Sequence, residues 1–537
     1  MISTQPRIQR SELPSSTYER VAAVRKAPED SGALYSKALK AFNKENYKKA
    51  FNLFHLLAKQ RMPEAQVNLA YLYDKGLGVK RDQAKAAKLY KKAAAQKNAV
   101  AQFNLGCMYE KGKGVKKDIK KAVRYYEKAA NQGVSVAQFN LATLYQEGRG
   151  VDKNPVKARE LFALAAQQGH AGAQFNLGCL YNLDKDYKKA TEFYELATEQ
   201  GDAGAQFNLG YLYQNGLGVE KNFRRAAQLY KQASDQGHTL AQYNLAYLYQ
   251  YGLGVEEDRR KAAELYDTAA ANGYALAQTN LGIMLFSGEG VEKDFGKAFS
   301  LFEKAAAQGD AKGQYYLAYF YEHGLHLKEN KKKAAAYYDL ASNQGEAMAQ
   351  TALGRMYQHG IGVEQNYKKA AELFQQAADQ DYNEAQSSLG YLYQHGLGVA
   401  RNFNKAVKLY EAAANNGNAM AQNNLAVMFE EGLGVKRSYK KALEYYELAA
   451  AQGNALAQNN LGTMYFKGMG VKRDYAKAFK YFKLAAKQGI ANAQNNVGVM
   501  YEFGLGCEKD KDRAIEWYKK AAASKSKAAA SRLKLLE

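Results

Sequence analysis

The chain has 537 residues, of which 47% are hydrophobic and 24% are charged, a balance that excludes a disordered chain. Only 5 prolines occur, which favours long helical arrays because proline interrupts a helix interior. The net charge of +23 comes mainly from the two ends: it is +16 over residues 33–136 (23 Lys and Arg against 7 Asp and Glu), −3 over 137–420 (28 against 31) and +9 over 421–537 (20 against 11).

The first 32 residues form a polar segment that we expect to be disordered. They contain no apolar run long enough for the core of a signal peptide, and no later stretch reaches membrane-spanning length. The three cysteines, Cys107, Cys179 and Cys507, are too few to staple a chain of this length, which favours a reducing compartment. We therefore expect a soluble protein in the cytoplasm, or one exported by a route without an N-terminal signal peptide.

A repeat follows this segment and continues almost to the C-terminus. Its opening letters, such as "AQFNLG" at 101–106, recur every 36 residues, except that the unit at 173 has 32. An earlier unit at 33 lacks the glutamine but matches the short unit, since "YKKA" stands at both 47–50 and 187–190. Residues 529–537 make half a unit that can cap the last hydrophobic face. Residues 33–528 thus contain fourteen units, with starts at 33, 65, 101, 137, 173, 205, 241, 277, 313, 349, 385, 421, 457 and 493.

Each unit predicts two amphipathic helices. In the unit at 101, the first apolar stripe contains Ala101, Leu105 and Met108, and the second contains Ala122 and Tyr126, both at helical spacing. A single hairpin cannot bury both of its apolar faces, so the units must stack, and a small rotation between neighbours winds them into a superhelix. The sequence predicts an all-α fold, an α/α solenoid of about fourteen helix hairpins.

The turns and caps of the hairpins are also visible in the sequence. Eleven of the twelve long units carry a Gly-x-Gly between the helices, such as Gly112-Lys113-Gly114, where glycine adopts positive φ without a clash. The unit at 313 departs from this pattern, with Gly324-Leu325-His326-Leu327 in the loop. An N-cap type precedes the second helix of every long unit: Asp82, Asp118, Asn154, Asn222, Asp258, Asp294, Asn330, Asn366, Asn402, Ser438, Asp474 and Asp510.

The unit pattern, AxAQxNLGxLYxxGxGVxxDxxKAxxxYxxAAxQG in units such as 101–136 and 205–240, resembles the Sel1-like repeat, a relative of the tetratricopeptide repeat. The resemblance covers about nine-tenths of the chain. It implies an α/α superhelix that acts as an adaptor or scaffold, in bacterial signalling and host interaction or in eukaryotic membrane-protein quality control, and it implies no common chemistry. One branch of the family, with a cysteine pair in each repeat, is linked to β-lactam binding, and this chain lacks those pairs.

The candidate binding residues follow the Ala-Gln pair in five successive units, as an aromatic residue and then asparagine. In the tetratricopeptide relatives the first helix lines the concave face, and the matching asparagine holds the backbone of an extended peptide, so the resemblance implies peptide binding. The alternative is that the asparagines bond the backbone of a neighbouring helix and the aromatic rings pack between hairpins. The candidates are Phe103, Asn104, Phe139, Asn140, Phe175, Asn176, Phe207, Asn208, Tyr243 and Asn244.

The asparagine position changes along the chain. In the units at 313, 349 and 385 it holds Tyr316, Ala352 and Ser388, and the last three units have a doubled asparagine, at 423–424, 459–460 and 495–496. These three patterns at the asparagine position indicate more than one partner segment, although sequence drift among redundant repeats explains the patterns almost as well.

A histidine ladder accompanies the middle group of units. His323, His359 and His395 stand one unit apart, just before the loop glycine. Neighbouring rungs should lie roughly 9 Å apart, too far for ligands of one metal ion. We therefore predict no metal site and attribute the ladder to the favourable position of imidazole at a helix C-terminus.

The lysine runs at 115–128 and 471–483 fall on the loop and the second helix. Such runs are usually solvated faces, but the charge of +16 over 104 residues would attract acidic proteins, anionic lipid head groups or nucleic acid. The sequence contains no recognised nucleic-acid-binding module. Protein partners and peripheral contact with an anionic membrane therefore rank above nucleic acid.

Signatures of catalysis are missing from the sequence, since it has no Walker-type phosphate loop, no Cys-x-x-Cys, no His-Glu-x-x-His and no nucleophile elbow. We therefore predict no enzymatic activity and no cofactor. The favoured function is a non-enzymatic scaffold that binds extended peptide segments of partner proteins on its concave face. The second hypothesis is recruitment to anionic surfaces by the basic ends, and the third is a hydrolase such as a β-lactamase-like enzyme.

Overall fold

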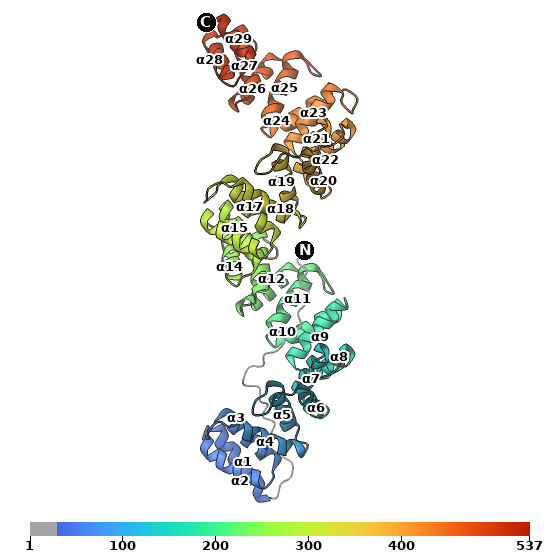
Figure 1. Cartoon of the computed structure of the whole chain (residues 1–537), viewed down its shortest axis with the longest axis vertical. Coiled ribbons are helices and arrows are strands. Elements are labelled where there is room, and N and C mark those ends of the chain that lie inside the picture. Colours follow the sequence, from blue (N-terminus) through green and yellow to red (C-terminus); the bar gives the residue numbers. More distant parts are fainter. Residues whose placement is uncertain (1–28, 537) are drawn as a thin grey trace. The chain divides into compact units, whose positions relative to one another are not determined.

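The computed structural model describes residues 29–536, and the regular elements in that range are all α-helices (Figure 1). Of the predicted polar segment 1–32, only residues 29–32 lie within the described part, in the first turn of α1 (Glu29–Asn43). The chain divides into two compact parts, a first part, Met1–Ala269, and a second part, Ala270–Glu537.

The helices alternate between the first and second helices of fourteen hairpins, which confirms the predicted all-α repeat architecture. The first helices are α1, α3 (Pro63–Lys75), α5 (Ala99–Lys111), α7 (Ser135–Glu147), α9 (Ala171–Leu183), α11 (Ala203–Asn215), α13 (Thr239–Tyr251), α15 (Ala275–Ser287), α17 (Ala311–His323), α19 (Ala347–His359), α21 (Asn383–His395), α23 (Ala419–Glu431), α25 (Ala455–Lys467) and α27 (Ala491–Phe503). The second helices are α2 (Tyr47–Lys59), α4 (Gln83–Ala95), α6 (Ile119–Ala130), α8 (Pro155–Gln167), α10 (Tyr187–Glu199), α12 (Phe223–Asp235), α14 (Arg259–Ala271), α16 (Phe295–Ala307), α18 (Lys331–Ser342), α20 (Tyr367–Ala378), α22 (Phe403–Asn415), α24 (Tyr439–Ala451), α26 (Tyr475–Lys487) and α28 (Lys511–Ala523). A last helix, α29 (Lys527–Leu536), covers most of the predicted half unit.

The second helices begin where the cap residues predicted. Asp82 Oδ1 accepts a hydrogen bond from the backbone N–H of Lys85 at 2.9 Å, and Asp258 does the same with Lys261 at 2.9 Å. The remaining ten cap residues accept in the same way, three residues on. Each cap satisfies an orphan amide of the first turn, so all twelve N-cap predictions are confirmed.

The two glycines of the loop have different tasks. Gly112 ends α5 in the left-handed region, with φ +71°, and donates its N–H to Met108 O. Gly114, with φ +67°, lies against the previous hairpin, where an added Cβ would be 2.1 Å from the backbone oxygen of Gln83 in α4. The positive φ of both glycines was predicted from the loop pattern. The close contact between hairpins at the second glycine was not.

In the hairpin at 313, a different pair of residues makes the close contact between the loop and the previous second helix. His326 stands where the second glycine is expected and adopts φ +66°. Its imidazole lies beside Gly296 in α16, where an added Cβ would be 3.0 Å from the histidine Cε1. Every other second helix carries a side chain at the position of Gly296. This glycine therefore makes room for the histidine of the next loop.

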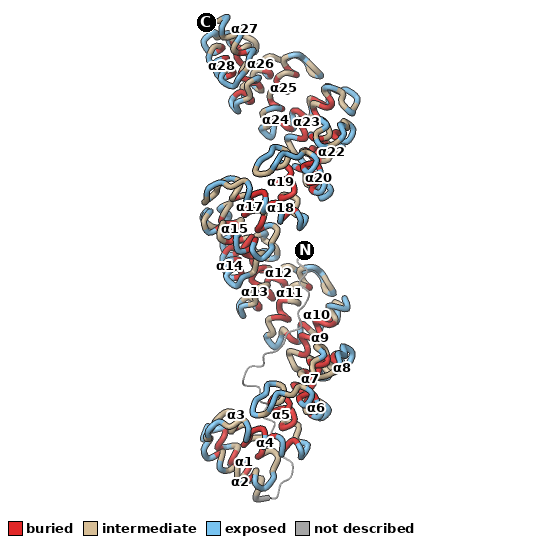
Figure 2. The backbone as a smooth tube through the Cα atoms, viewed as in Figure 1, coloured by how far each residue is buried: buried red, intermediate tan, exposed pale blue. Residues whose placement is uncertain are grey.

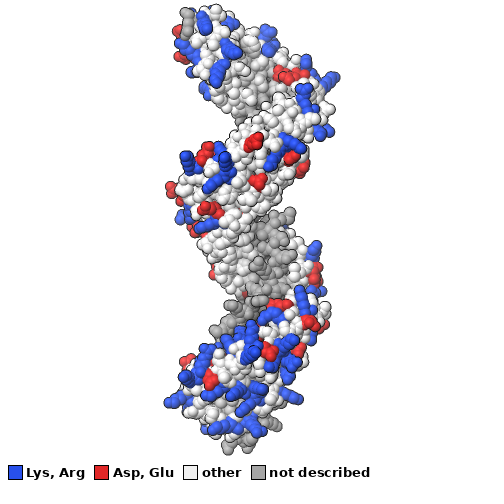
Figure 3. Space-filling view, in the orientation of Figure 1, with Lys and Arg blue, Asp and Glu red and all other residues white. Residues whose placement is uncertain are grey.

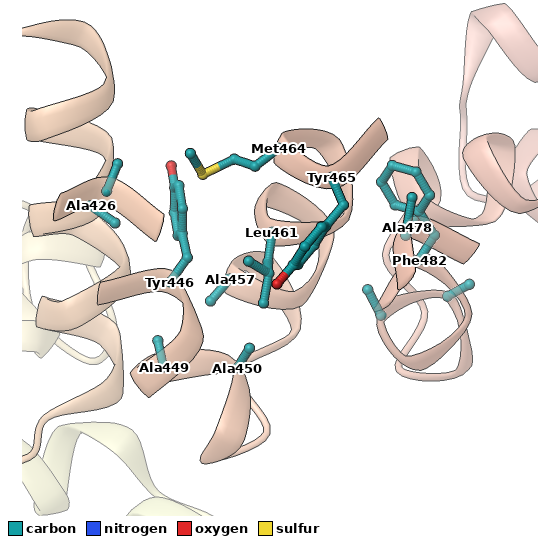
Figure 4. Packing of buried hydrophobic residues seen from close by; sticks show 14 of the residues in the cluster. Ala426, Tyr446, Ala449, Ala450, Ala457, Leu461, Met464, Tyr465, Ala478 and Phe482 are labelled. Atoms are coloured by element: carbon teal, nitrogen blue, oxygen red, sulfur yellow. The ribbon is translucent and has the colours of Figure 1, made fainter. Parts of the chain in front are cut away.

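The core lies between the paired helices, and Figure 2 shows buried residues there and exposed residues on the loops. The aromatic residue of each second helix lies at the centre of this core, as shown by Tyr126 and Phe162, which are fully buried. Figure 4 shows the same arrangement in the second part, with Tyr446 between Ala426 and Met464. Burial of such a ring contributes roughly 1.5–3 kcal/mol, so the hairpins hold each other by a repeated apolar contact.

Candidate protein-binding face

The glutamine of the Ala-Gln pair links neighbouring hairpins. Gln102 Nε2 donates to Ala94 O, at the end of the previous second helix, at 3.3 Å, and its Oε1 accepts from Gln132 Nε2 at 2.7 Å. This role was missed at the sequence level, although the Gln-Gly that ends most units was the signal. The glutamine pairs are 96–66, 132–102, 168–138, 200–174, 236–206, 308–278, 344–314, 380–350, 452–422 and 488–458.

The aromatic members of the predicted binding stripe are core residues. Phe103, Phe139, Phe175, Phe207 and Tyr243 are all buried, with at most 8% of their surface exposed. Each ring packs on the aromatic of its own second helix, with centroids 5.5–6.1 Å apart. These rings therefore cannot form the open hydrophobic row that the sequence suggested.

Two asparagines of the stripe form hydrogen bonds with the hydroxyl groups of buried tyrosines. Asn208 Nδ2 lies 3.3 Å from the hydroxyl oxygen of Tyr194 in the previous second helix, and Asn244 forms the same type of bond with Tyr230. Asn208 and Asn244 are half-buried, like Asn140. Asn208 and Asn244 therefore do bond a neighbouring helix, as the alternative proposed. Their partner is a tyrosine hydroxyl and not the backbone of that helix.

Two members of the stripe, Asn104 and Asn176, are buried completely or nearly so. The hairpin before Asn176 has Phe162 in place of the usual tyrosine and so offers no hydroxyl. Both amide atoms of Asn176, together with Oε1 of Gln146, are buried without a hydrogen-bond partner among the described residues. These two side chains face inward and do not reach a ligand.

The exposed surface of the first helices contains the half-buried members of the asparagine position and two further positions of each helix. We count the Ala of the Ala-Gln pair as register 1 and name the side chains at registers 4, 7 and 11 the first-helix face. Tyr247 and Tyr251, at registers 7 and 11 of α13, are 37% and 56% exposed, and their ring centroids lie 4.7 Å apart. Tyr391 is 40% exposed and packs on His395 at 4.3 Å. The first-helix face thus presents exposed pairs of rings one helical turn apart.

Some successive first helices contact each other directly. Such contacts join α9 to α11 in the first part and α15 to α17 in the second. At these two places the surfaces of neighbouring first helices are continuous.

The first three hairpins present a basic surface (Figure 3). Figure 3 shows Lys and Arg side chains gathered over α1–α6. Part of this charge is structural: Lys121 Nζ lies 5.6 Å from the ring centroid of Tyr109, and equivalent cation–π pairs recur in most later hairpins. Lysine on this surface therefore has a packing role as well as a charge.

The remaining sequence candidates lie apart from one another. His323, His359 and His395 are exposed at the ends of three successive first helices. Within residues 29–536, no three His, Cys, Asp or Glu side chains gather in a way that could hold a metal ion. In the same range, no helix has the length and apolar character needed to cross a membrane.

The thiols are buried or partly buried and free of disulfides. Burial raises the pKa of Cys107 to about 11 and that of Cys179 to about 12. Burial also raises the pKa of the half-buried Cys507. All three thiols are therefore protonated and poorly nucleophilic near neutral pH.

Comparison with known families finds one match, the Sel1 repeat model, in fourteen segments: residues 43–61, 63–98, 99–134, 135–170, 171–202, 203–238, 239–274, 275–310, 311–346, 347–382, 383–418, 419–454, 455–490 and 491–526. A comparison with curated protein sequences finds no significant match.

Among solved structures, the chain is similar to c5321, a protective antigen present in uropathogenic Escherichia coli strains that displays an SLR fold. The identity is 30%, the match covers 91% of this chain and 97% of that chain, and the TM-score is 0.70. It is also similar to a Sel1 repeat protein from Oxalobacter formigenes, with 29% identity, coverage of 58% of this chain and 90% of that chain, and a TM-score of 0.43.

Proposed function

We propose that this chain, which belongs to the Sel1 repeat family, is a non-enzymatic scaffold that binds extended segments of partner proteins on its first-helix face. The observation that carries the proposal is the set of exposed ring pairs on that face, such as Tyr247 with Tyr251 and Tyr391 with His395. Exposed tyrosine supplies a large contact area with little loss of side-chain entropy, and it is enriched among the residues that dominate protein interfaces.

The arrangement of the first helices supports the same assignment. Because first helices contact each other at α9 with α11 and at α15 with α17, we place the first helices on the concave side of each part. Half-buried asparagines at register 4 of the same face, such as Asn140 and Asn208, can still offer one amide edge to a peptide backbone. The second helices expose leucines instead, as at Leu340 and Leu448.

Two further observations support a scaffold rather than an enzyme. The three thiols have raised pKa values, so none of them is an activated nucleophile. The exposed histidines of the ladder stand one per hairpin, which is the arrangement of a repeated surface rather than of a catalytic cluster.

The similarity to the protective antigen of uropathogenic E. coli supports a setting for the scaffold. An antigen that protects a host is accessible to that host's immune system. The likeness extends over 91% of this chain, and it supports a bacterial protein whose partners include molecules of a host cell.

A second candidate function is recruitment to anionic surfaces. Lys37, Lys40, Lys44, Lys48 and Lys49 are all exposed on α1 and α2 or the turn between them, in the region that Figure 3 shows as densely basic. Replacement of these five lysines by glutamine tests it in the full chain. Binding to vesicles that contain 30% phosphatidylserine should be lost near 0.5 M salt and with the variant, because the screening length there is about 4 Å.

A peptide-display selection tests the scaffold. Random 12-residue peptides are selected on the wild-type protein and on a variant with Tyr247, Tyr251 and Tyr391 changed to serine. The matched control changes the exposed leucines of the second helices, Leu164, Leu340 and Leu448, to serine. We expect the tyrosine variant to retain less than a tenth of the selected peptides and the leucine variant to retain most of them. Equal retention by the two variants would contradict the proposal.

A further inference from the structure

Three consecutive hairpins of the second part differ from the others on the first-helix face. At register 4, asparagine gives way to Tyr316, Ala352 and Ser388, and at register 11 histidine appears in all three hairpins. Register 7 holds Tyr319, Arg355 and Tyr391 in the same hairpins. In the thirteen units from 65 onward, Arg355 is the only charged residue at register 7. Registers 4 and 11 therefore change together over α17, α19 and α21, and register 7 changes in α19.

We propose that the first-helix face of α17, α19 and α21 binds an extended protein segment that has a single Asp or Glu flanked by apolar or aromatic side chains, with the carboxylate on Arg355. This inference rests on the proposed function and specifies the chemistry of the partner.

The surroundings of Arg355 leave its guanidinium available. The side chain is exposed, and no carboxylate of the described residues lies within 4.0 Å of it. Its charge acts on the hydroxyl groups of Tyr315 and Tyr338, in α17 and α18, and of Tyr382 at the N-cap of α21. Arg355 is therefore an exposed cation whose two neighbouring first helices carry the ring pairs Tyr319 with His323 and Tyr391 with His395. Arginine and tyrosine are enriched among the residues that dominate protein interfaces.

Three carboxylates act on the tyrosines near Arg355: Glu322, Glu346, which makes no side-chain cap hydrogen bond, and the exposed Glu384. Glu322 accepts a hydrogen bond from the hydroxyl of Tyr338 at 2.7 Å, and its Oε2 lies 3.8 Å from His323 Nε2. Glu346, at the N-cap of α19, acts on Tyr316 and Tyr382. A ligand with a run of acids would be repelled by Glu322 and Glu346, which favours one carboxylate with uncharged neighbours.

The rings on either side of Arg355 define what flanks the carboxylate. Tyr319 packs on His323 at 4.2 Å on one neighbouring first helix, and Tyr391 packs on His395 at 4.3 Å on the other. A planar guanidinium binds a carboxylate through two parallel hydrogen bonds. Because ring pairs lie on both sides, a bound chain continues past Arg355 in both directions. The carboxylate therefore belongs to a side chain within the segment rather than to a chain terminus.

The spacing of the ligand follows from the spacing of the helices. Neighbouring first helices lie on the order of 10 Å apart, and an extended chain advances about 3.3 Å per residue. The apolar side chains that reach Tyr319 and Tyr391 should therefore stand about three residues before and after the acid. The expected motif is an apolar residue, two residues of any type, Asp or Glu, two residues of any type, and a second apolar residue.

The test uses random 12-residue displayed peptides selected on the full-length wild type, on R355Q and on K332Q. Lys332 is exposed on the second helix α18, so K332Q removes one positive charge away from the proposed site. We expect the wild type and K332Q to enrich the motif, and R355Q to lose the acid. For one enriched synthetic peptide, the change of its Asp to Asn or its Glu to Gln should weaken binding to the wild type at least about tenfold. The same change should weaken binding to R355Q less than about twofold.

The alternatives are separated by the same measurements. Peptides that bind the wild type without a preferred acid, or with an acid that R355Q retains, overturn this inference and leave the scaffold intact. A wild type that enriches no peptide overturns both proposals. A wild-type dimer that R355E converts to a monomer assigns the face to a second copy of the chain and overturns the peptide. Because Arg355 is exposed, R355Q should retain the circular dichroism and melting temperature of the wild type.

Discussion

Gln132 donates a hydrogen bond from Nε2 to Oε1 of Gln102 at 2.7 Å, across thirty residues of sequence. Gln102 in turn donates to the last turn of the previous second helix, at Ala94 O. One side-chain pair thus joins both helices of a hairpin to the hairpin before it. The link requires a glutamine side chain at each of its two positions. The recurrence of the Ala-Gln and Gln-Gly dipeptides reflects this requirement.

The hairpin at 385 lacks this link and can be repaired. Asn416 stands where the second glutamine is expected, and Oε1 of Gln386 is buried without a partner among the described residues. The longer side chain of Asn416→Gln should reach Gln386 and stabilise the array by about 1 kcal/mol. Urea-induced unfolding followed by circular dichroism measures the gain. Asn415→Gln, at the exposed neighbouring position, is the control and should change nothing.

A second substitution can supply a missing hydrogen bond, to the unpaired side-chain amides of Gln146 and Asn176 beside Phe162. In the hairpin at 205, Tyr230 donates to Gln214 Oε1 at 2.6 Å and bonds Asn244, whereas Phe162 leaves the equivalent Gln146 and Asn176 unpaired. Phe162→Tyr should therefore stabilise the protein by about 1 kcal/mol. Slower hydrogen exchange in α7–α9 would report the gain.

The control for this substitution is Phe302→Tyr. The positions equivalent to Gln146 and Asn176 are there Phe286 and Tyr316; the ring of Tyr316 stacks on Phe302, and Phe286 packs on Tyr316. The new hydroxyl should lower stability by about 1–3 kcal/mol, because it would be buried among rings that offer little hydrogen bonding. A gain of the same size in both variants would contradict the proposed tyrosine network.

The second loop glycine predicts a large difference between two similar substitutions. Gly114→Ala places a Cβ 2.1 Å from the backbone oxygen of Gln83 and keeps a positive φ, so it should cost about 3–5 kcal/mol. Gly133→Ala has φ +84° and nothing within 4 Å of the added Cβ, so it should cost only about 1 kcal/mol. Thermal melts of the two variants measure the difference. Equal costs would mean that the loop does not press on the previous hairpin.

The N-cap histidines predict a loss of stability in mild acid. The Nδ1 of His170 accepts from the backbone N–H of Ala173 at 3.2 Å, and His238 does the same with Ala241 at 3.2 Å. Burial lowers the pKa of both imidazoles below the usual 6.5. Their stabilising contribution is therefore complete above pH 6.5 and is lost as the pH falls through the lower folded-state pKa.

Melting temperatures at pH 7.5 and pH 5 test this dependence. The variant with His170 and His238 both changed to asparagine should lose less stability between the two pH values, because asparagine caps the same position at Asn98 with an N–H at 2.9 Å. The control changes the exposed His323 and His359 to asparagine and should melt like the wild type. An unchanged pH dependence in the His170 and His238 variant would contradict the assignment.

The hairpins were predictable because their signals are local. Asp118 accepts from an amide three residues away, and Gly112 ends the helix to which it belongs. The glutamine pair was not predictable in this way, since Gln102 and Gln132 meet only after two helices have packed.

The stripe of Phe103 and Asn104 was misplaced for a geometrical reason. Neighbouring residues on a helix point about 100° apart, so the two side chains cannot form adjacent rows on one open face. Phe103 turns into the hairpin, where its ring lies 5.9 Å from that of Tyr126. The residues that face outward stand at registers 7 and 11, as at Tyr247 and Tyr251. Their varied identity gave no repeated letter to follow.

The central claim is that partner segments lie along the first-helix face, and photo-crosslinking tests it most directly. A peptide enriched on the full-length protein is synthesised with a central benzophenone, irradiated with the protein and mapped by mass spectrometry. The account predicts adducts on first helices, at or beside exposed residues such as Tyr247, Tyr251 and Tyr391, and their loss on competition with unlabelled peptide. Competable adducts confined to the second helices, around Leu340 and Leu448, would contradict it.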